Sequence, residues 1–180
     1  TVGEGDRGPM TGGMGVICPT PVIADLAAIT DAVLRPAARG MVAEGRPFQG
    51  LLFAGVMMTP AGPKVLEFNC RFGDPETQAL MMLLDEPLGP LLLAVSEGRL
   101  SERAPLRFHP GASACIVVAA SGYPGPPRRG DEISGLEAAQ SLSPAHLQIF
   151  HAGTARDATG TLRSAGGRVL GVTARGPDLE

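Results

Sequence analysis

The sequence contains no tryptophan, and aromatic residues make up only 4% of its 180 residues. Proteins that bind single-stranded nucleic acids stack bases on aromatic side chains, so this composition argues against that class. Basic residues are not in excess, because the formal net charge is −3 at pH 7 and Lys64 is the single lysine. The basic footprint of a nucleic-acid-binding protein is therefore missing, and we expect no nucleic-acid partner.

Long hydrophobic runs are also missing. The longest apolar stretches, such as LLFAGVMM and ACIVVAA, are far shorter than the roughly 20 residues that a membrane helix needs. No secretory leader is visible, so we expect no membrane partner and a cytoplasmic location. The three cysteines, Cys18, Cys70 and Cys115, are odd in number and widely spaced, which fits reduced thiols better than a disulfide framework. CxxC and HExxH motifs are missing too, so a structural zinc site is not expected.

Hydrophobic residues make up 44% of the chain, which is enough to form a buried core. Residues 1–19 are predicted to form a loop, because six of the first fifteen residues are glycine. A helix with a kink at Pro36 is predicted next, since apolar residues recur there at spacings of three and four. Its apolar face consists of Leu26, Ile29, Val33, Ala37 and Met41. A β-hairpin follows, with strands at 51–58 and 65–69 around the turn TPAGPK.

The rest of the chain is predicted to begin with helices and to end with short strands. FGDPETQALMMLLDEPLGPLLLAVSEGRL predicts a helix, a break at DEPLGP and another helix, and SERAPLRFHPG predicts a linker. Three strands are then expected, at 114–120, 147–151 and 168–174, the last entered through a hairpin with SAGG at its turn. We therefore predict an α+β protein with one domain at residues 1–104 and a small β-rich domain at 105–180.

The stretch EFNCRFGDPETQ carries several charged residues that could take part in binding or catalysis. Alternate side chains of a strand share a face, so Glu67, Asn69 and Arg71 point one way if the strand persists that far. Phe68, Cys70 and Phe72 then form an inward face. Carboxylate and amide oxygens suit Mg²⁺, and a guanidinium suits a phosphate. A solvent-facing row with an internal Glu–Arg pair explains the same spacing, and the residues alone leave both interpretations open.

Several neighbouring residues have simpler structural explanations. Asp74 is a natural N-cap with Pro75 at the first helical position, and Glu76 complements the helix dipole. Both carboxylates could still face a substrate ammonium group. The loop GDRGPMTGGMG could bring backbone N–H groups close to an anion, although it matches no Walker A motif and a plain mobile loop explains it as well. Buried packing is expected for His151, for Cys70 and for the methionines, which are Met57, Met58, Met81 and Met82.

The motifs GEGDRGPMTGGMG, GLLFAGVMM, EFNCRFGDPETQ, FHAGT and GGRVLGVTA, in this order, resemble the C-terminal part of the phosphoribosylamine–glycine ligase family. These enzymes are ATP-grasp ligases of purine biosynthesis, and the resemblance covers nearly the whole chain. It implies the C-terminal half of an ATP-grasp domain followed by a small β-rich C-terminal module. It also implies a reaction in which ATP phosphorylates glycine and the amine of 5-phosphoribosylamine attacks the glycyl phosphate.

The resemblance also implies roles for individual residues. Glu67 and Asn69 would hold Mg²⁺ or Mn²⁺ at the ATP phosphates, and Arg71 would neutralise the transferred phosphoryl group. The implied ligands of glycine and 5-phosphoribosylamine are Asp6, Thr11, Gly12, Gly13, Gly15, Asp74 and Glu76. Within the loop, Met10 stands where the family pattern suggests a polar Asn.

The chain departs from the family in extent. It shows neither the family's N-terminal domain nor the nucleotide-clamping half with its lysines, and RGPDLE stops before the family's closing helix. We therefore expect the N-terminal domains in a parent protein, and no ligase activity from these 180 residues alone. Two alternatives remain open: another ATP-grasp ligase of the same pathway, and a non-catalytic fragment or binding module that keeps the fold.

Overall fold

The computed structural model describes residues 1–5 and 7–179. Helices and strands are mixed along the chain, which confirms the predicted α+β class. None of the described helices is long and apolar enough to cross a membrane. The chain divides into two compact units, and the sites below belong to one or the other. The first compact unit comprises residues 1–19, 74–83 and 109–180, and the second comprises residues 20–73 and 84–108.

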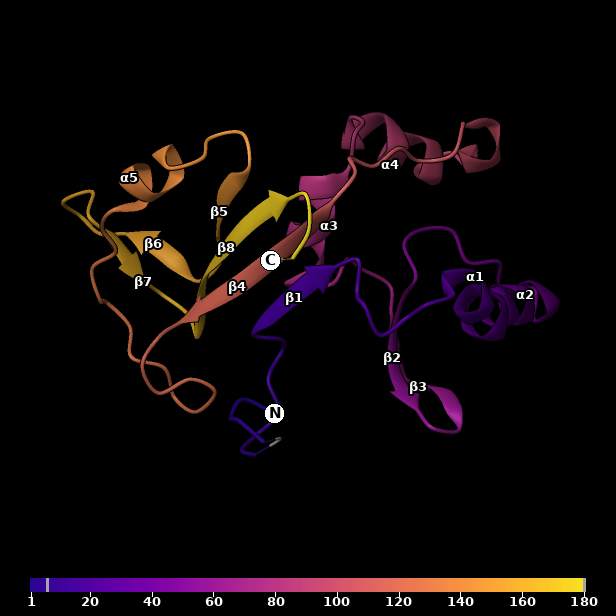
Figure 1. Cartoon of the computed structure of the whole chain (residues 1–180), viewed down its shortest axis with the longest axis horizontal. Coiled ribbons are helices and arrows are strands. Elements are labelled where there is room, and N and C mark those ends of the chain that lie inside the picture. Colours follow the sequence, from indigo (N-terminus) through magenta and orange to yellow (C-terminus); the bar gives the residue numbers. More distant parts are fainter. Residues whose placement is uncertain (6, 180) are drawn as a thin grey trace. The chain divides into compact units, whose positions relative to one another are not determined.

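A four-stranded antiparallel sheet forms the centre of the first unit (Figure 1). Its spatial order is β1 (Gly15–Cys18), β4 (Ala112–Ala119), β8 (Arg168–Gly176) and β5 (Leu147–His151). The strands predicted at 114–120, 147–151 and 168–174 are confirmed within one or two residues, because their β-branched, apolar runs suit a half-buried pleated surface.

Helix α3 (Glu76–Leu83) packs against β1, β4 and β8. Ala79, in the middle of the helix, is completely buried. The buried hydroxyl of Ser113 in β4 donates a hydrogen bond of 2.7 Å to the Ala79 carbonyl oxygen. This bond anchors α3 to the sheet, which places the residues just before the helix beside the strand ends of the same unit.

The first unit also contains α5 (Leu136–Ser141), a short helix that was not predicted from the sequence. Four buried residues form the adjacent core: Ala120, Ile149, Val169 and Leu170. Leu136 and Ala139 of the helix pack against this cluster. The helix therefore exists chiefly because it covers the sheet, since six residues are too few for helix propensity alone to hold.

The expected hairpin around SAGG is wrong. The strand before this segment, β7 (Leu162–Ser164), pairs with β6 (Thr154–Arg156) in a separate two-stranded sheet, whereas β8 pairs with β4 and β5. SAGG thus links two sheets. Gly153 and Gly166 lie so close there that a Cβ on Gly153 would be 2.6 Å from the Gly166 Cα, and this approach requires glycine.

The prediction that residues 1–19 form only a loop is also wrong at its end. Residues 15–18 form β1, which pairs with β4 in the register Gly15–Ile116 to Cys18–Ser113. The glycines concealed the strand because the local pattern is that of a loop, and the partner strand lies about a hundred residues away in the sequence.

The second compact unit begins with the predicted helix, which is confirmed. It runs through α1 (Leu26–Ile29), a π-turn η1 (Thr30–Leu34) and α2 (Arg35–Ala43). The Arg35 N–H donates to the Thr30 carbonyl five residues back, directly before Pro36. Proline lacks an N–H and its ring crowds the preceding turn, so the wider π-turn accommodates it without ending the helix.

The predicted hairpin is confirmed as β2 (Phe53–Thr59) and β3 (Gly62–Asn69). Its predicted inward face is wrong. Phe68 is 43% exposed and Cys70 is exposed, as are the supposed core residues Met57 and Met58. The two strands form a sheet by themselves, and a two-stranded ribbon leaves both faces open unless another element of its unit covers one.

The helix–break–helix prediction is confirmed by α3 and by α4 (Leu88–Ser96), which belongs to the second unit. A single 3₁₀ turn, η2 (Leu100–Glu102), follows within the predicted linker. The domain boundary near residue 104 stays a prediction. The two compact units are discontinuous in sequence, and only their last change-over, between residues 108 and 109, lies near it.

Candidate functional site

The predicted metal ligands lie at the end of β3 in the second unit. Asn69 is the last residue of the strand, and its Nδ2 donates a hydrogen bond of 2.8 Å to Oε1 of Glu67. Opposite Glu67 in the ladder is Gly55, next to a β-bulge between Gly55 and Val56. The strand alternation thus brings Glu67 and Asn69 together on one face, as the sequence predicted.

This donor set fits a hard divalent cation. The Asn69 amide uses its N–H₂ group on Glu67, so its Oδ1 and the second carboxylate oxygen of Glu67 have no hydrogen-bond partner among the described residues. Two oxygens from one amide and one carboxylate suit Mg²⁺, which keeps several waters or phosphate oxygens. Within the described residues, no group of three or more His, Cys, Asp and Glu lies together, so an all-protein cage is not present there.

Arg71 stands apart from this pair. The strand ends at Asn69, so Arg71 does not share its alternation. Its guanidinium donates a hydrogen bond of 2.9 Å to the carbonyl oxygen of the following residue, Phe72, and the side chain is exposed. No internal ion pair between Glu67 and Arg71 forms among the described residues, which removes the reason for regarding this row as a self-paired surface.

The predicted substrate ligands lie in the first unit. The Asp74 carboxylate accepts from Gln78 Nε2 at 2.8 Å and from Arg168 Nη2 at 2.9 Å. Glu76 lies in the first turn of α3, as predicted. The prediction that Pro75 occupies the first helical position after an Asp74 cap is wrong, because the helix begins at Glu76 and Pro75 directly precedes it. Asp74 remains half exposed despite its two partners. A carboxylate has about four acceptor positions, so it can still accept a hydrogen bond from a ligand ammonium group.

The glycine loop lies against Asp74. Thr11 Oγ1 accepts a 3.3 Å hydrogen bond from the Gly13 N–H, and the carbonyl oxygens of Gly12 and Gly13 accept from Arg168. Gly15 starts β1 and packs on β4, where its own Cβ would lie 3.1 Å from a carbonyl oxygen. Asp6, also predicted to bind substrate, lies outside the described residues.

Three residues of this region were not predicted as site residues: Tyr123, Gln78 and Arg168. Tyr123 Oη lies 3.5 Å from the Gly12 nitrogen, and Gln78 and Arg168 hold Asp74. Arg168 lies in GGRVLGVTA and Gln78 ends EFNCRFGDPETQ, two motifs of the family resemblance, whereas none of these motifs contains Tyr123. The contacts of Tyr123 with Gly12 and of Arg168 with Asp74 join residues more than ninety positions apart and left no local pattern to find, whereas Gln78 lies only four residues after Asp74.

Cys115 is buried in the sheet and is not activated as a nucleophile. Burial raises the pKa of the Cys115 thiol, a hydrogen bond with Thr173 acts in the opposite direction, and the negative charges of Asp74 and Glu76 raise it further. A thiol with a raised pKa is a poor source of thiolate at neutral pH. The expected burial of His151 is wrong, because the residue is exposed; its Nδ1 lies 3.1 Å from Thr154 Oγ1, which gives it a hydrogen-bond partner.

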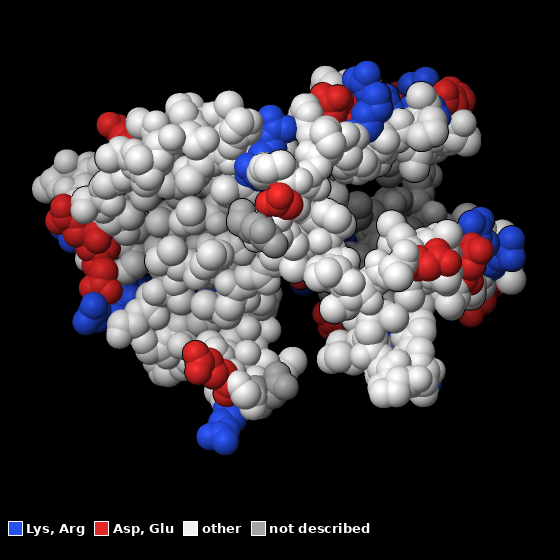
Figure 2. All heavy atoms as spheres, viewed as in Figure 1, with Lys and Arg blue, Asp and Glu red and all other residues white. Residues whose placement is uncertain are grey.

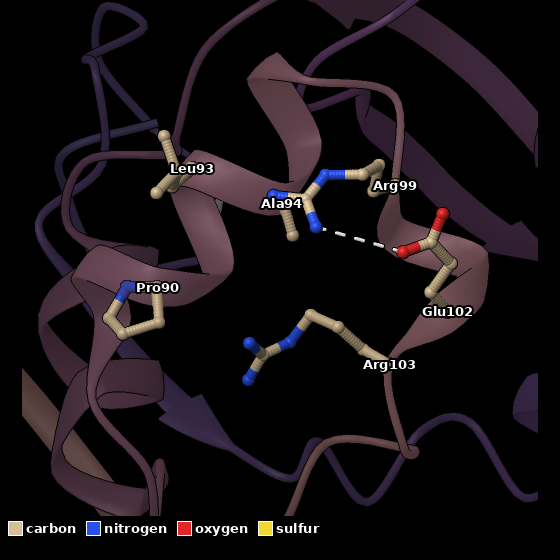
Figure 3. Close-up of a pocket in the computed structure, with 6 residues that line it drawn as sticks. All are labelled: Pro90, Leu93, Ala94, Arg99, Glu102 and Arg103. Carbon is tan, nitrogen blue, oxygen red and sulfur yellow. Dashed lines mark ion pairs between the residues drawn. The ribbon is translucent and has the colours of Figure 1, made fainter.

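A pocket of about 300 Å³ lies beside α4 in the second unit (Figure 3). Its lining residues are Pro90, Leu93, Ala94, Arg99, Glu102 and Arg103. The basic groups are already neutralised: Arg99 pairs with Glu97 and Glu102, and Arg103 lies 2.6 Å from Glu86. Figure 2 shows acidic and basic side chains side by side over this helix and the turn after it. The pocket thus offers no excess positive charge for a phosphate.

Two family models match the chain. Residues 1–77 match the ATP-grasp (A) domain of phosphoribosylglycinamide synthetase, and residues 113–180 match its C domain. The chain belongs to the phosphoribosylamine–glycine ligase family. The order of an ATP-grasp segment and a C domain agrees with the fold class expected from the motifs.

Individual relatives of this family agree. The chain is 48% identical to the phosphoribosylamine–glycine ligase of Rhodopirellula baltica, covering 98% of this chain and 40% of that protein. It is also 48% identical to the Synechocystis enzyme, over 99% of this chain and 42% of that protein. The crystal structure of the Thermotoga maritima ligase matches with a TM-score of 0.79 and 34% identity, covering 97% of this chain and 42% of that one. The chain therefore spans about two fifths of the length of these relatives.

Proposed function

We propose that this chain supplies the metal-binding and substrate-binding residues of an ATP-dependent ligase that joins glycine to 5-phosphoribosylamine. The γ-phosphoryl group of ATP passes to a glycine carboxylate oxygen and ADP leaves. The amine of 5-phosphoribosylamine then attacks the glycyl carbonyl, loses a proton and releases phosphate, giving glycinamide ribonucleotide. We propose a cytoplasmic location, although the Arabidopsis thaliana relative is named chloroplastic.

The contact between Glu67 and Asn69 carries the proposal. It presents a carboxylate and an amide oxygen side by side at a strand end, in a chain of this ligase family. We assign Glu67 and Asn69 as ligands of Mg²⁺ or Mn²⁺. The ion, when bound, would neutralise charge on the ATP phosphates.

The other roles follow from charge and position. Arg71, which is exposed and bonded only to its neighbour's carbonyl among the described residues, would turn its guanidinium to the transferred phosphoryl group and stabilise its charge. Asp74 and Glu76 would hold the ammonium group of glycine or the amine of 5-phosphoribosylamine. The glycine loop, with Thr11, Gly12, Gly13 and Gly15, would lie against glycine or 5-phosphoribosylamine. Asp6, from the same stretch of sequence, is proposed as a further ligand of these substrates.

The test uses a chimera in which this chain replaces the matched two fifths of the Rhodopirellula baltica enzyme. We expect ADP release that requires both glycine and 5-phosphoribosylamine. Bicarbonate and other amine or carboxylate substrates should not replace them, which separates this ligase from other ATP-grasp ligases of the pathway. If a folded chimera released no ADP in the presence of both substrates, the proposed function would be wrong.

Glu67→Gln in that chimera tests the metal assignment. The substitution keeps size and removes the charge, so turnover should fall by roughly a hundredfold or more while the melting temperature stays within a few degrees. The matched control is Glu97→Gln, which alters an exposed carboxylate paired with Arg99 and should leave turnover unchanged. Turnover of Glu67→Gln close to that of the parent would refute the role.

A further inference from the structure

Arg168 makes an unusually large set of contacts for a residue that opens a strand. Its Nη1 donates to the carbonyl oxygens of Gly12 at 2.8 Å, Gly13 at 3.2 Å and Asp74 at 2.6 Å. Its Nη2 donates to the Asp74 carboxylate at 2.9 Å. The side chain is 23% exposed, so these bonds are partly shielded from water. One guanidinium therefore joins β8 to two segments that lie far from it in sequence.

The glycine loop is shaped around this guanidinium. A Cβ on Gly12 would lie 3.2 Å from the Arg168 Cζ, and a Cβ on Gly13 would lie 2.8 Å from Cδ of Pro75. The loop backbone thus approaches both the arginine and the proline at distances that a side chain would prevent. A lysine could not replace the arginine, because a single ammonium on a flexible stem lacks the planar fork that serves several acceptors at once.

The two carboxylate oxygens of Asp74 accept hydrogen bonds from two different residues. Oδ1 accepts from Gln78 on α3, and Oδ2 accepts from Arg168 on β8. The carboxylate plane is consequently set by two elements of the unit, and it does not rotate freely. Arg168 lies in the segment that matches the C domain, whereas Gly12, Gly13 and Asp74 lie in the segment that matches the ATP-grasp domain.

We propose that Arg168 is a positioning residue for the substrate site, through which the C domain fixes the glycine loop and the Asp74 carboxylate of the ATP-grasp segment in one arrangement. The expected effect of Arg168 on substrate binding rests on the proposed function, in which Asp74 and the loop are substrate ligands. Loss of the guanidinium frees the loop and the carboxylate together, so substrate binding weakens while the metal ligands Glu67 and Asn69 keep their own contact.

The first test is hydrogen exchange of the 180-residue chain carrying Arg168→Met or Arg168→Lys. We expect amides of residues 11–15 to exchange about tenfold faster in both variants, since neither substitute restores the fork. The matched control is Arg163→Met, which removes another arginine of the same unit, bonded to Asp157 and to the Gly130 carbonyl. It should leave the loop unchanged. Unchanged exchange at residues 11–15 in Arg168→Met would overturn the positioning.

The second test measures steady-state kinetics of the same variants in the chimera. We expect the KM for glycine or 5-phosphoribosylamine to rise about tenfold or more, with kcat and the KM for ATP little changed. A purely structural defect would lower the active fraction and hence kcat at constant KM, which would overturn the role at the substrate site. Inactivity of the parent chimera would count against the proposed function only, and hydrogen exchange would still decide whether Arg168 positions the loop.

Discussion

Gly13 combines a backbone conformation and a neighbour that together exclude a side chain. Its φ of +105° is rarely adopted by residues other than glycine, and a Cβ would lie 2.8 Å from Cδ of Pro75. Because the ring belongs to a buried proline directly before α3, it has little room to move. The glycine at this position is therefore a packing requirement as well as a source of backbone freedom.

Gly13→Ala should lower the free energy of unfolding by about 2–4 kcal/mol, the sum of backbone strain and overpacking. Gly130→Ala is the matched control, since Gly130 has a φ of +90° but nothing within 4 Å of its Cβ position. It should lose only the backbone part, about 1 kcal/mol. Urea denaturation followed by circular dichroism measures both. Equal losses in the two variants would show that the Pro75 contact is not restrictive.

At the level of elements, α3 is held to the sheet by a buried polar contact. The Ser113 hydroxyl donates to the Ala79 carbonyl, and both residues are nearly or fully buried. A buried donor of this kind has no water to replace its partner, so the bond contributes more than the same bond at the surface.

Ser113→Ala should therefore cost about 1–2 kcal/mol of unfolding free energy. Ser141→Ala provides the comparison, because Ser141 donates to the Glu137 carbonyl at the same 2.7 Å but is exposed. That variant should change stability by less than about 0.5 kcal/mol. Thermal and urea denaturation of both variants measure the difference. A cost for Ser141→Ala as large as that for Ser113→Ala would contradict the importance of burial.

The hairpin of β6 and β7 depends on one carboxylate. Asp157 accepts from the Thr159 hydroxyl at 2.6 Å, from Arg163 Nε at 2.5 Å, and from the backbone N–H groups of Thr159 and Thr161. These bonds favour the charged carboxylate and hold the pKa of Asp157 well below its usual range, against a smaller opposing effect of desolvation. The turn between the two strands is thus closed by a charged group.

The lowered pKa predicts a pH dependence with a definite sign. The unfolded chain, with an Asp pKa of about 4, takes up the proton first as the pH falls. The stability that Asp157 contributes is therefore complete above about pH 5 and is lost progressively below pH 4. Asp157→Asn should lower the melting temperature at pH 6 and reduce the further fall between pH 6 and pH 3. An unchanged fall in melting temperature would refute the linkage.

For the whole molecule, the contrast lies between a four-stranded sheet, whose central strands β4 and β8 each contain buried residues, and a two-stranded ribbon that contains none. β8 pairs with strands on both of its edges, and its Thr173 is completely buried. The β2–β3 hairpin has only one ladder, and Leu66 and Phe68 on its return strand are exposed. Local opening therefore requires less disruption in the ribbon than in the sheet.

Hydrogen exchange of the intact chain should follow this contrast. Amides of β4 and β8 should exchange at least about tenfold more slowly than amides of β2 and β3, because only the former open with the unit's core. Mass spectrometry of peptides from 53–69 and from 168–176 measures the difference. Equal protection would mean that another surface covers the ribbon in solution.

Local sequence pattern was sufficient for most elements. The 3.6-residue spacing predicted the helix from Leu26 onward, and the apolar runs predicted β2, β4, β5 and β8. It was not sufficient for β1 and α5, whose residues form these elements because a distant strand or core completes them. Burial on the ribbon was mispredicted for the same reason, since alternation shows two faces but not which face is covered.

Sequence motifs were enough to assign the family. Strand alternation was enough to place Glu67 and Asn69 side by side, because residues two apart in a strand share a face whatever surrounds it. The tertiary structure alone decided that β8 lies between β4 and β5, and that Arg168 reaches Gly12, Gly13 and Asp74. These contacts join residues 94 to 156 positions apart. No local propensity encodes such distances, which arise only when the whole sheet is assembled and its strand ends meet.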